Sequence, residues 1–136
     1  MSSTTTKRET LRVGSDGDVV RVRQTVRALA VELGFSLVDQ TKIVTAASEI
    51  ARNTLEYGGG GEALVEAVEL RGRRGIRLVF SDQGPGITDV SMALTDGHTT
   101  GKGLGLGLGG ARRLVNEFDI ETAVGRGTRV TLVRWK

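Results

Sequence analysis

Residues 101–110 read Gly-Lys-Gly-Leu-Gly-Leu-Gly-Leu-Gly-Gly, and six of these ten residues are glycine. Glycine loses more backbone entropy on folding than any other residue, so packing alone does not favour this density. A loop whose backbone must approach a bulky anion does favour it, because the N–H groups at the start of the following helix can bind phosphate. A flexible linker is the alternative, but such linkers are rich in serine and polar residues, not alternating leucines. We therefore interpret the stretch as a phosphate-binding loop that leads into a helix over residues 111–117.

Two familiar phosphate-binding motifs do not account for this loop. Residues 105–110 satisfy G-x-G-x-x-G, but that dinucleotide motif needs a strand directly before it, and residues 95–102 are polar and loop-like. Residues 97–102 are one residue short of the P-loop pattern, and Gly103 stands where that pattern needs serine or threonine. A nucleotide bound by this loop must therefore be held in a third way.

Apolar residues at helical spacing predict two long helices upstream of the loop. The first covers residues 19–33, with Asp16 or Asp18 placed to cap it. The second opens at Ser36, which has the spacing of a capping box, and runs to about residue 57, where four consecutive glycines end it.

The strands are predicted from alternating apolar residues bounded by turns. They cover residues 62–70, 75–81, 119–124 and 128–135, with a short edge strand over 11–13. Residues 1–10 are expected to be a disordered lead and residues 88–101 a loop. Together the elements predict an α+β fold in one domain over residues 11–136. In that fold, a two-layer α/β sandwich, the helices pack on one face of a mixed, mostly antiparallel sheet.

Composition narrows the class of protein further. With 38% hydrophobic and 26% charged residues the chain is globular, and the absence of cysteine excludes disulfides and thiolate metal sites. The first residues lack the apolar core of a signal peptide and no apolar run approaches membrane-spanning length, so we expect a cytoplasmic protein without a membrane partner. A net charge of +3 and scattered basic residues give no argument for nucleic-acid binding.

Three polar side chains stand out beside the glycine-rich loop. Glu49 and Asn53 are four residues apart, so they share one face of the second helix, next to its apolar stripe. On that helix alone, two solvated polar residues are the favoured interpretation. Asp82 ends a strand and opens the turn Asp-Gln-Gly-Pro-Gly over residues 82–86. Its carboxylate lies beside an open backbone and can accept a hydrogen bond from a ligand amino group.

These residues belong to an ordered series that resembles the GHKL (Bergerat-fold) ATPases. The series is Glu49-x-x-x-Asn53, Asp82-x-Gly84-x-Gly86, Gly103-x-Gly105-x-Gly107 and Gly125-x-Gly127-Thr128. Within that family the chain looks like the small bacterial switch kinases of the RsbT type, and the segments 32–40 and 48–53 carry this likeness. Anti-sigma factor kinases of the RsbW type are the near relatives.

The resemblance implies that the chain binds ATP and Mg²⁺, and it implies a role for several residues. Glu49 would be the catalytic base that accepts the proton of the attacking hydroxyl, and Asn53 would coordinate Mg²⁺. Asp82 would accept from the adenine amino group, with Gly86 letting the base approach and Thr128 supporting Asp82 or a bound water. The nucleotide-binding positions implied in this way are Asn53, Asp82, Gly84, Gly86, Ile87, Lys102, Gly103, Leu104, Gly105, Leu106, Gly107, Leu108 and Thr128.

The lid over the nucleotide would be residues 88–107, which order when the nucleotide binds. Four residues of that lid either take part in binding or are plain loop positions, and both interpretations stay open for them: Lys102, His98, Thr99 and Thr100. His98 is the only histidine in the chain, so no phospho-accepting histidine stands on a dimerisation helix and a histidine kinase is excluded.

The activity implied is that of a stand-alone serine/threonine kinase that uses ATP to phosphorylate a STAS-domain antagonist protein. This belongs to a bacterial partner-switching, stressosome-like pathway, in which the kinase activates a PP2C-type phosphatase once it is released. The alternative is an anti-sigma factor that sequesters a sigma factor and phosphorylates its anti-anti-sigma antagonist. Glu49 favours catalysis in both cases, because sequestration alone needs no base.

Overall fold

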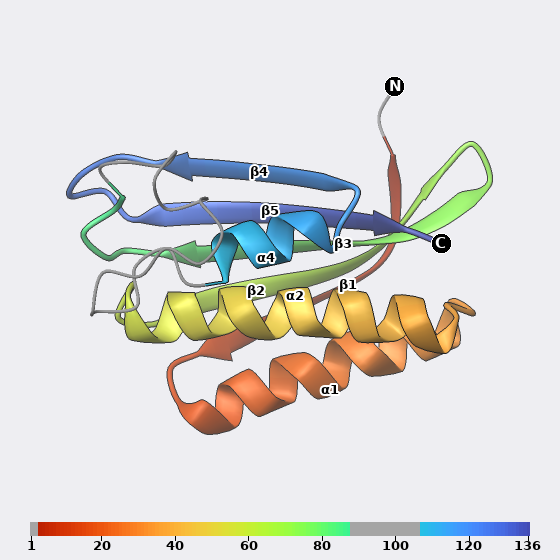
Figure 1. Cartoon of the computed structure of the whole chain (residues 1–136), viewed down its shortest axis with the longest axis horizontal. Helices are drawn as coiled ribbons and strands as arrows, with labels where there is room; N and C mark the ends of the chain where they lie inside the picture. Colours follow the sequence, from red (N-terminus) through yellow and green to blue (C-terminus); the bar gives the residue numbers. More distant parts are fainter. Residues whose placement is uncertain (1–2, 88–106) are drawn as a thin grey trace.

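The chain folds into two layers, as seen in a computed structural model that describes residues 3–87 and 107–136 (Figure 1). Within these residues five strands form one sheet in the order β1-β2-β3-β5-β4, and every neighbouring pair is antiparallel. The helices lie together on one face of the sheet (Figure 1). The predicted α+β two-layer sandwich is confirmed, and the sheet, expected to be mixed, contains no parallel pairing in the described part of the chain.

The helices and strands match most of the predicted ranges. They are β1 (Thr4–Val13), α1 (Asp16–Glu32), α2 (Leu37–Glu56), β2 (Gly61–Leu70), β3 (Arg73–Asp82), α4 (Leu108–Arg113), β4 (Glu117–Thr122) and β5 (Thr128–Trp135).

Side-chain caps set where the two long helices begin. Ser36 caps α2 as predicted, and its hydroxyl accepts the N–H of Asp39. For α1 the predicted cap was wrong: Ser15 is the N-cap and accepts from the N–H of Asp18 at 3.2 Å. Asp18 instead accepts the N–H of Gly14 at 2.8 Å, and this hydrogen bond holds the pKa of its carboxyl below the usual value. The Asp18 carboxylate therefore accepts from the residue before the N-cap, and not from the N-cap N–H as in a capping box.

Of the residues expected to be disordered, 4–10 are instead part of β1, which pairs with β2 from Thr4 onward. A buried carboxylate helps to hold this edge strand in place. Glu66 of β2 accepts from Arg8 Nε at 2.9 Å and from Arg77 Nε at 2.7 Å. The sequence misled because residues 4–10 are all polar, whereas what holds them in the sheet is backbone pairing with β2 and the contacts of Glu66; low hydrophobicity alone does not indicate disorder.

The core lies between the sheet and the helices, and α4 enters it differently from the prediction. The helix expected over residues 111–117 begins earlier, at Leu108, and ends at Arg113, so β4 starts at Glu117. Leu108 and Ala111 are buried in the core, and α4 packs against α2. Tertiary burial of these side chains outweighs the poor helix propensity of the two glycines inside α4.

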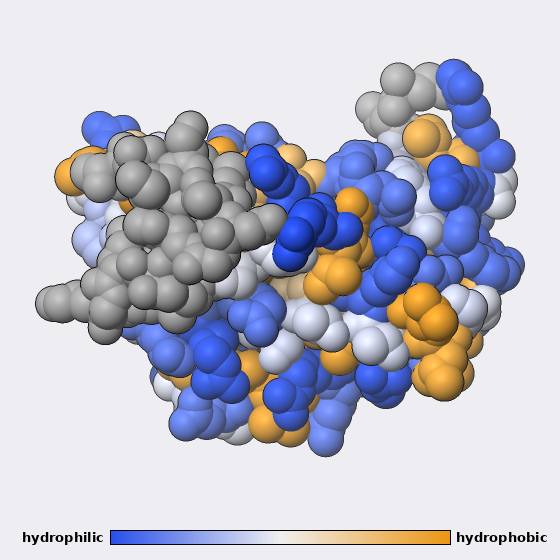
Figure 2. All heavy atoms as spheres, viewed as in Figure 1, coloured by the Kyte–Doolittle hydropathy of each residue, from blue (hydrophilic) through white to orange (hydrophobic). Residues whose placement is uncertain are grey.

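On the face shown in Figure 2 the surface is largely hydrophilic, with hydrophobic side chains in small separate groups. The most exposed of the large apolar side chains in the described chain are Leu37, Val38 and Val124. Among residues 3–87 and 107–136, none of the helices combines the length and the hydropathy that crossing a membrane requires.

Candidate nucleotide-binding site

A pocket opens between the C-terminal half of α2, the end of β3 and the start of β5. This is the end of the molecule at which α2 finishes and β5 begins (Figure 1). Most of its walls are apolar, and a few polar groups point inward. The lining residues are Ile50, Asn53, Thr54, Tyr57, Phe80, Asp82, Ile87, Leu108, Thr128 and Val130.

Asp82 supplies the charged group of this pocket. It is the last residue of β3, opposite Thr128 of β5, and its Oδ1 accepts the N–H of Gly84 at 2.9 Å and that of Thr128 at 3.2 Å. Burial raises the pKa of the Asp82 carboxyl above its usual value, and the two backbone hydrogen bonds only partly offset this. Both of these bonds go to one oxygen. The carboxylate is therefore oriented by the backbone and has a second oxygen with which to accept from a ligand.

The threonine at the start of β5 completes the polar side of the pocket. Thr128 is buried, and its hydroxyl lies 2.9 Å from that of Thr122, its cross-strand partner at the end of β4. An acidic acceptor, a hydroxyl and apolar walls together suit a flat, weakly polar ring that carries an amino group. Adenine has this chemistry.

Glu49 and Asn53 lie one turn apart on α2, on the side that meets α4. Asn53 lines the pocket, whereas Glu49 is exposed and lies beside Gly107 at its rim. Gly107 is the N-cap of α4 and has φ of 79°, a left-handed conformation that favours glycine. A Cβ there would overlap the Glu49 carboxylate. The approach of the glycine-rich segment to the predicted catalytic base thus depends on a residue without a side chain.

The donor set also bears on a metal ion. Within residues 3–87 and 107–136 no three His, Cys, Asp or Glu side chains cluster as a metal site would need. Mg²⁺ usually takes one or two protein oxygens and completes its shell with water and substrate phosphate. The Asn53 carboxamide beside the pocket fits that pattern, since it can supply one hard oxygen ligand.

The pocket brings together five of the sequence-predicted binding residues from four separate segments: Asn53, Asp82, Ile87, Leu108 and Thr128. Gly84 and Gly86 lie in the turn behind Asp82 and do not line the pocket. A Cβ on Gly86, whose φ is 78°, would overlap the Ala123 carbonyl, so the contact with the β4–β5 turn already requires glycine there. The predicted positions Lys102, Gly103, Leu104, Gly105 and Leu106, and all of the predicted lid except Gly107, lie outside the described residues.

Two residues of this region were missed from the sequence. Tyr57 lines the pocket, and the spacing of Glu49, Asn53 and Tyr57, four residues each, could have placed it on the same helix face. The sequence gives no comparable signal for Thr122, because only the strand register of the structure shows that it lies beside Thr128.

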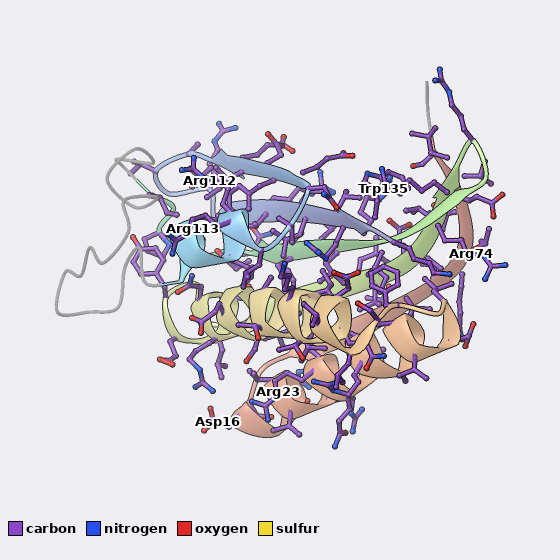
Figure 3. The ribbon with its side chains drawn as sticks, turned by 45° about the vertical axis from the view of Figure 1, so that its right-hand side comes forward. Asp16, Arg23, Arg74, Arg112, Arg113 and Trp135 are labelled. Carbon is purple, nitrogen blue, oxygen red and sulfur yellow. The ribbon has the colours of Figure 1, made fainter. Side chains whose placement is uncertain are left out.

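Positive charge lies on α4, whose first residue lines the pocket. Arg112 and Arg113 extend from this short helix at the end of the molecule that holds the pocket, whereas Arg74 lies at the opposite end, in the β2–β3 hairpin (Figure 3). Both α4 arginines are exposed. The short helix α4 therefore places two cationic side chains at the pocket end of the molecule.

Comparison with known proteins agrees with this chemistry. The model of a family described as "Histidine kinase-like ATPase domain" matches residues 15–134. The chain belongs to this ATPase family. The match spans α1 to β5 and so includes every wall of the pocket. It also agrees with the resemblance to the GHKL ATPases seen in the sequence.

Two curated relatives of this histidine kinase-like ATPase cover nearly all of it. Serine/threonine-protein kinase RsbT of Bacillus subtilis (strain 168) is 43% identical over 125 residues, which are 92% of this chain and 94% of the relative. Anti-sigma F factor of Clostridium novyi (strain NT) is 27% identical over 137 residues, which are 97% of this chain and 94% of that protein. The first relationship places the chain with the serine/threonine-protein kinases of the RsbT type.

A solved structure supports the fold. The crystal structure of the RsbU and RsbW domains of a Mycobacterium tuberculosis protein matches 96% of this chain with a TM-score of 0.63 and 25% identity. The matched part is 33% of the solved chain, so this ATPase spans about a third of that larger protein.

Proposed function

We propose that this RsbT-type kinase binds ATP in the pocket and transfers the terminal phosphoryl group to a serine or threonine of a STAS-domain antagonist protein. The observation that carries the proposal is the oriented, half-buried carboxylate of Asp82 in a pocket whose rim also holds Glu49 and Asn53. The pocket suits adenine and the rim offers the groups that phosphoryl transfer needs.

In the proposed complex Asp82 accepts a hydrogen bond from the adenine amino group, and the apolar walls formed by Ile50, Phe80 and Val130 hold the ring faces. These contacts select the base and orient the nucleotide. The backbone N–H groups of the glycine-rich segment that ends at Gly107 are proposed to bind the phosphates.

Asn53 is proposed to supply one oxygen ligand to Mg²⁺. The chemistry that the ion would supply when bound is neutralisation of charge on the phosphates. Glu49, one turn earlier on α2, then accepts the proton of the acceptor hydroxyl. As that proton leaves, the hydroxyl oxygen bonds to the terminal phosphorus, the bond from that phosphorus to the bridging oxygen breaks, and ADP is the leaving group. Exposure of Glu49 is consistent with this role, because a base for a protein substrate must be reachable from outside.

The direct test is phosphoryl transfer. Purified chain, Mg²⁺ and [γ-³²P]ATP are incubated with STAS-domain proteins from the native cell, beside Glu49→Gln and a control, Glu56→Gln. Glu56 is exposed at the end of α2 and pairs with Arg52, so the control removes the same charge elsewhere on this helix. We expect label transfer with the wild type and the control and a loss of about 10²- to 10⁴-fold with Glu49→Gln. Equal transfer by the wild type and Glu49→Gln would exclude Glu49 as the base.

A second candidate function is an anti-sigma factor that sequesters a sigma factor and uses the kinase reaction to reset itself. The relationship to Anti-sigma F factor of Clostridium novyi favours considering it. The kinase proposal instead includes activation of a PP2C-type phosphatase. Affinity capture with each purified partner class separates the two: binding to the phosphatase alone supports the first function, and binding to a sigma factor supports the second.

A further inference from the structure

The peptide group between Gly86 and Ile87 is held from both sides by side chains of different elements. Tyr57 Oη donates to the Gly86 carbonyl at 2.7 Å, and the Ile87 N–H donates to Thr122 Oγ1 at 2.9 Å. Tyr57 is the C-cap of α2 and Thr122 ends β4, so the two anchors come from the two layers of the sandwich. We refer to Tyr57, Thr122 and this peptide as the peptide clamp.

Burial makes these hydrogen bonds consequential. Gly86 and Ile87 are both buried, and a buried backbone N–H or carbonyl that loses its partner costs more than the bond contributes when made. Each half of the clamp is thus a requirement for this peptide orientation, and neither half can be replaced by water without rearrangement.

The clamp joins the turn to the helical layer by a hydrogen bond, beside the close packing of Gly58 against Asp82 and Gly84. Within this turn, Gly84 N–H bonds to Asp82 and the Pro85 carbonyl accepts from Gly125 N–H, so both of those bonds come from the sheet layer. Tyr57 is bonded through its own N–H to the Asn53 carbonyl on α2. Tyr57 thus links the wall of the pocket formed by α2 to the turn that follows β3.

Thr122 acts on the pocket by a second route. Its hydroxyl has one proton and already accepts from Ile87, and it lies 2.9 Å from Thr128 Oγ1 and 3.1 Å from the Gly127 carbonyl. Whichever of these two acceptors takes the proton, Thr122 restricts the direction of the Thr128 hydroxyl, which lines the pocket. Ile87 and Thr128 are consequently positioned together by one residue outside the pocket.

We propose that Tyr57 and Thr122 are positioning residues for the nucleotide base: by clamping the Gly86–Ile87 peptide they set the width of the base pocket. This inference rests on the proposed binding of ATP in that pocket. Because the clamp lies at the base end, its loss is expected to weaken the binding of ATP and of ADP equally. Glu49 variants show the opposite pattern, with transfer lost and nucleotide affinity kept.

The test uses Tyr57→Phe, Thr122→Val, the double variant and Thr122→Ser, which keeps the hydroxyl. Thr131→Val is the control, since Thr131 is half-buried on the opposite face of the neighbouring strand β5. Calorimetry gives the Kd for ATP and for ADP, and hydrogen exchange gives the protection of the Ile87 amide without nucleotide. Unfolding in urea shows that each variant is folded at the temperature of the assay.

We expect each single loss to raise both Kd values about two- to tenfold, the effect of one hydrogen bond. In the double variant the Kd values are expected to rise by less than the product of the two single-variant increases, because both bonds hold the same peptide. Ile87 exchanges faster in both single variants, and Thr122→Ser restores protection and affinity. Unchanged Kd values and Ile87 exchange in folded Tyr57→Phe would overturn the inference. Absence of nucleotide binding by the wild type would instead refute the proposed function, while Ile87 exchange would still report on the clamp.

Discussion

Replacing Asp82 with asparagine separates the role of its charge from that of its shape. Asparagine keeps an oxygen that can accept the two N–H groups now bonded to Oδ1, from Gly84 at 2.9 Å and Thr128 at 3.2 Å. Its NH₂ group replaces the second carboxylate oxygen. In the proposed complex this NH₂ donor would face another donor, the adenine amino group. The variant therefore loses the base contact but retains the local fold.

The magnitude follows from the kind of hydrogen bond that is lost. A hydrogen bond to a charged group contributes about 1.5–3 kcal/mol, so the Kd for ATP should rise about 10- to 150-fold. Stability should not fall in parallel. Burial raises the pKa of Asp82 because it disfavours the ionised form, and asparagine removes that charge. In the wild type the stability contributed by protonated Asp82 is fully present below the ordinary pKa of 3.8 and is lost as the pH rises through the raised native pKa.

Calorimetry with Mg-ATP and urea unfolding across pH measure the two effects. Asp119→Asn is the matched control, because Asp119 is an exposed carboxylate of β4 and does not line the pocket. We expect weak ATP binding and undiminished stability at neutral pH for Asp82→Asn, with neither change in the control. ATP bound equally tightly by the wild type and by Asp82→Asn would refute the assignment of Asp82 to the base.

Three further predictions concern the rim and the outer face of the sheet. Gly107→Ala should cost about 1–3 kcal/mol in an unfolding assay and slow phosphoryl transfer about 10- to 100-fold, because its φ of 79° is strained for alanine and the new Cβ overlaps Glu49. Asn53→Ala should make nucleotide affinity insensitive to chelation of Mg²⁺ by EDTA, whereas the wild type should lose affinity; equal sensitivity would argue against a ligand role. Burial would raise the pKa of Glu66, but hydrogen bonds from Arg77 and Arg8 outweigh it and the net shift is downward. Glu66 therefore contributes stability above its ordinary pKa of 4.5 that is lost as the pH falls through the lowered native pKa. Glu66→Gln should cost about 1–3 kcal/mol in urea unfolding and lose this acid dependence, with the Kd for ATP unchanged; a change in that Kd would contradict its separation from the site.

The parts of the fold that depend on local sequence were predictable. Ser36 caps α2 because of its own side chain and the residue three positions later, and four glycines end the helix. The parts that depend on tertiary contacts were not. The start of α4 at Leu108 and the ordering of β1 both follow from burial against distant segments, which the local pattern does not encode.

The candidate site divides in the same way. Asp82 was singled out by its turn chemistry, whereas Glu49 and Asn53 were singled out because they belong to an ordered series that resembles the GHKL ATPases. Tyr57 and Thr122 were not found, because their importance comes from a peptide group that the fold brings between them. Side chains that position others, and do not themselves carry the chemistry, leave the weakest mark on a single sequence.

A crystal structure of the chain with Mg²⁺ and a non-hydrolysable ATP analogue tests the central claim most directly. The account predicts the adenine ring between α2 and β5, its amino group at hydrogen-bonding distance from Asp82, and the terminal phosphate on the side of Glu49. A base bound elsewhere, or a pocket into which the analogue does not enter, would contradict it.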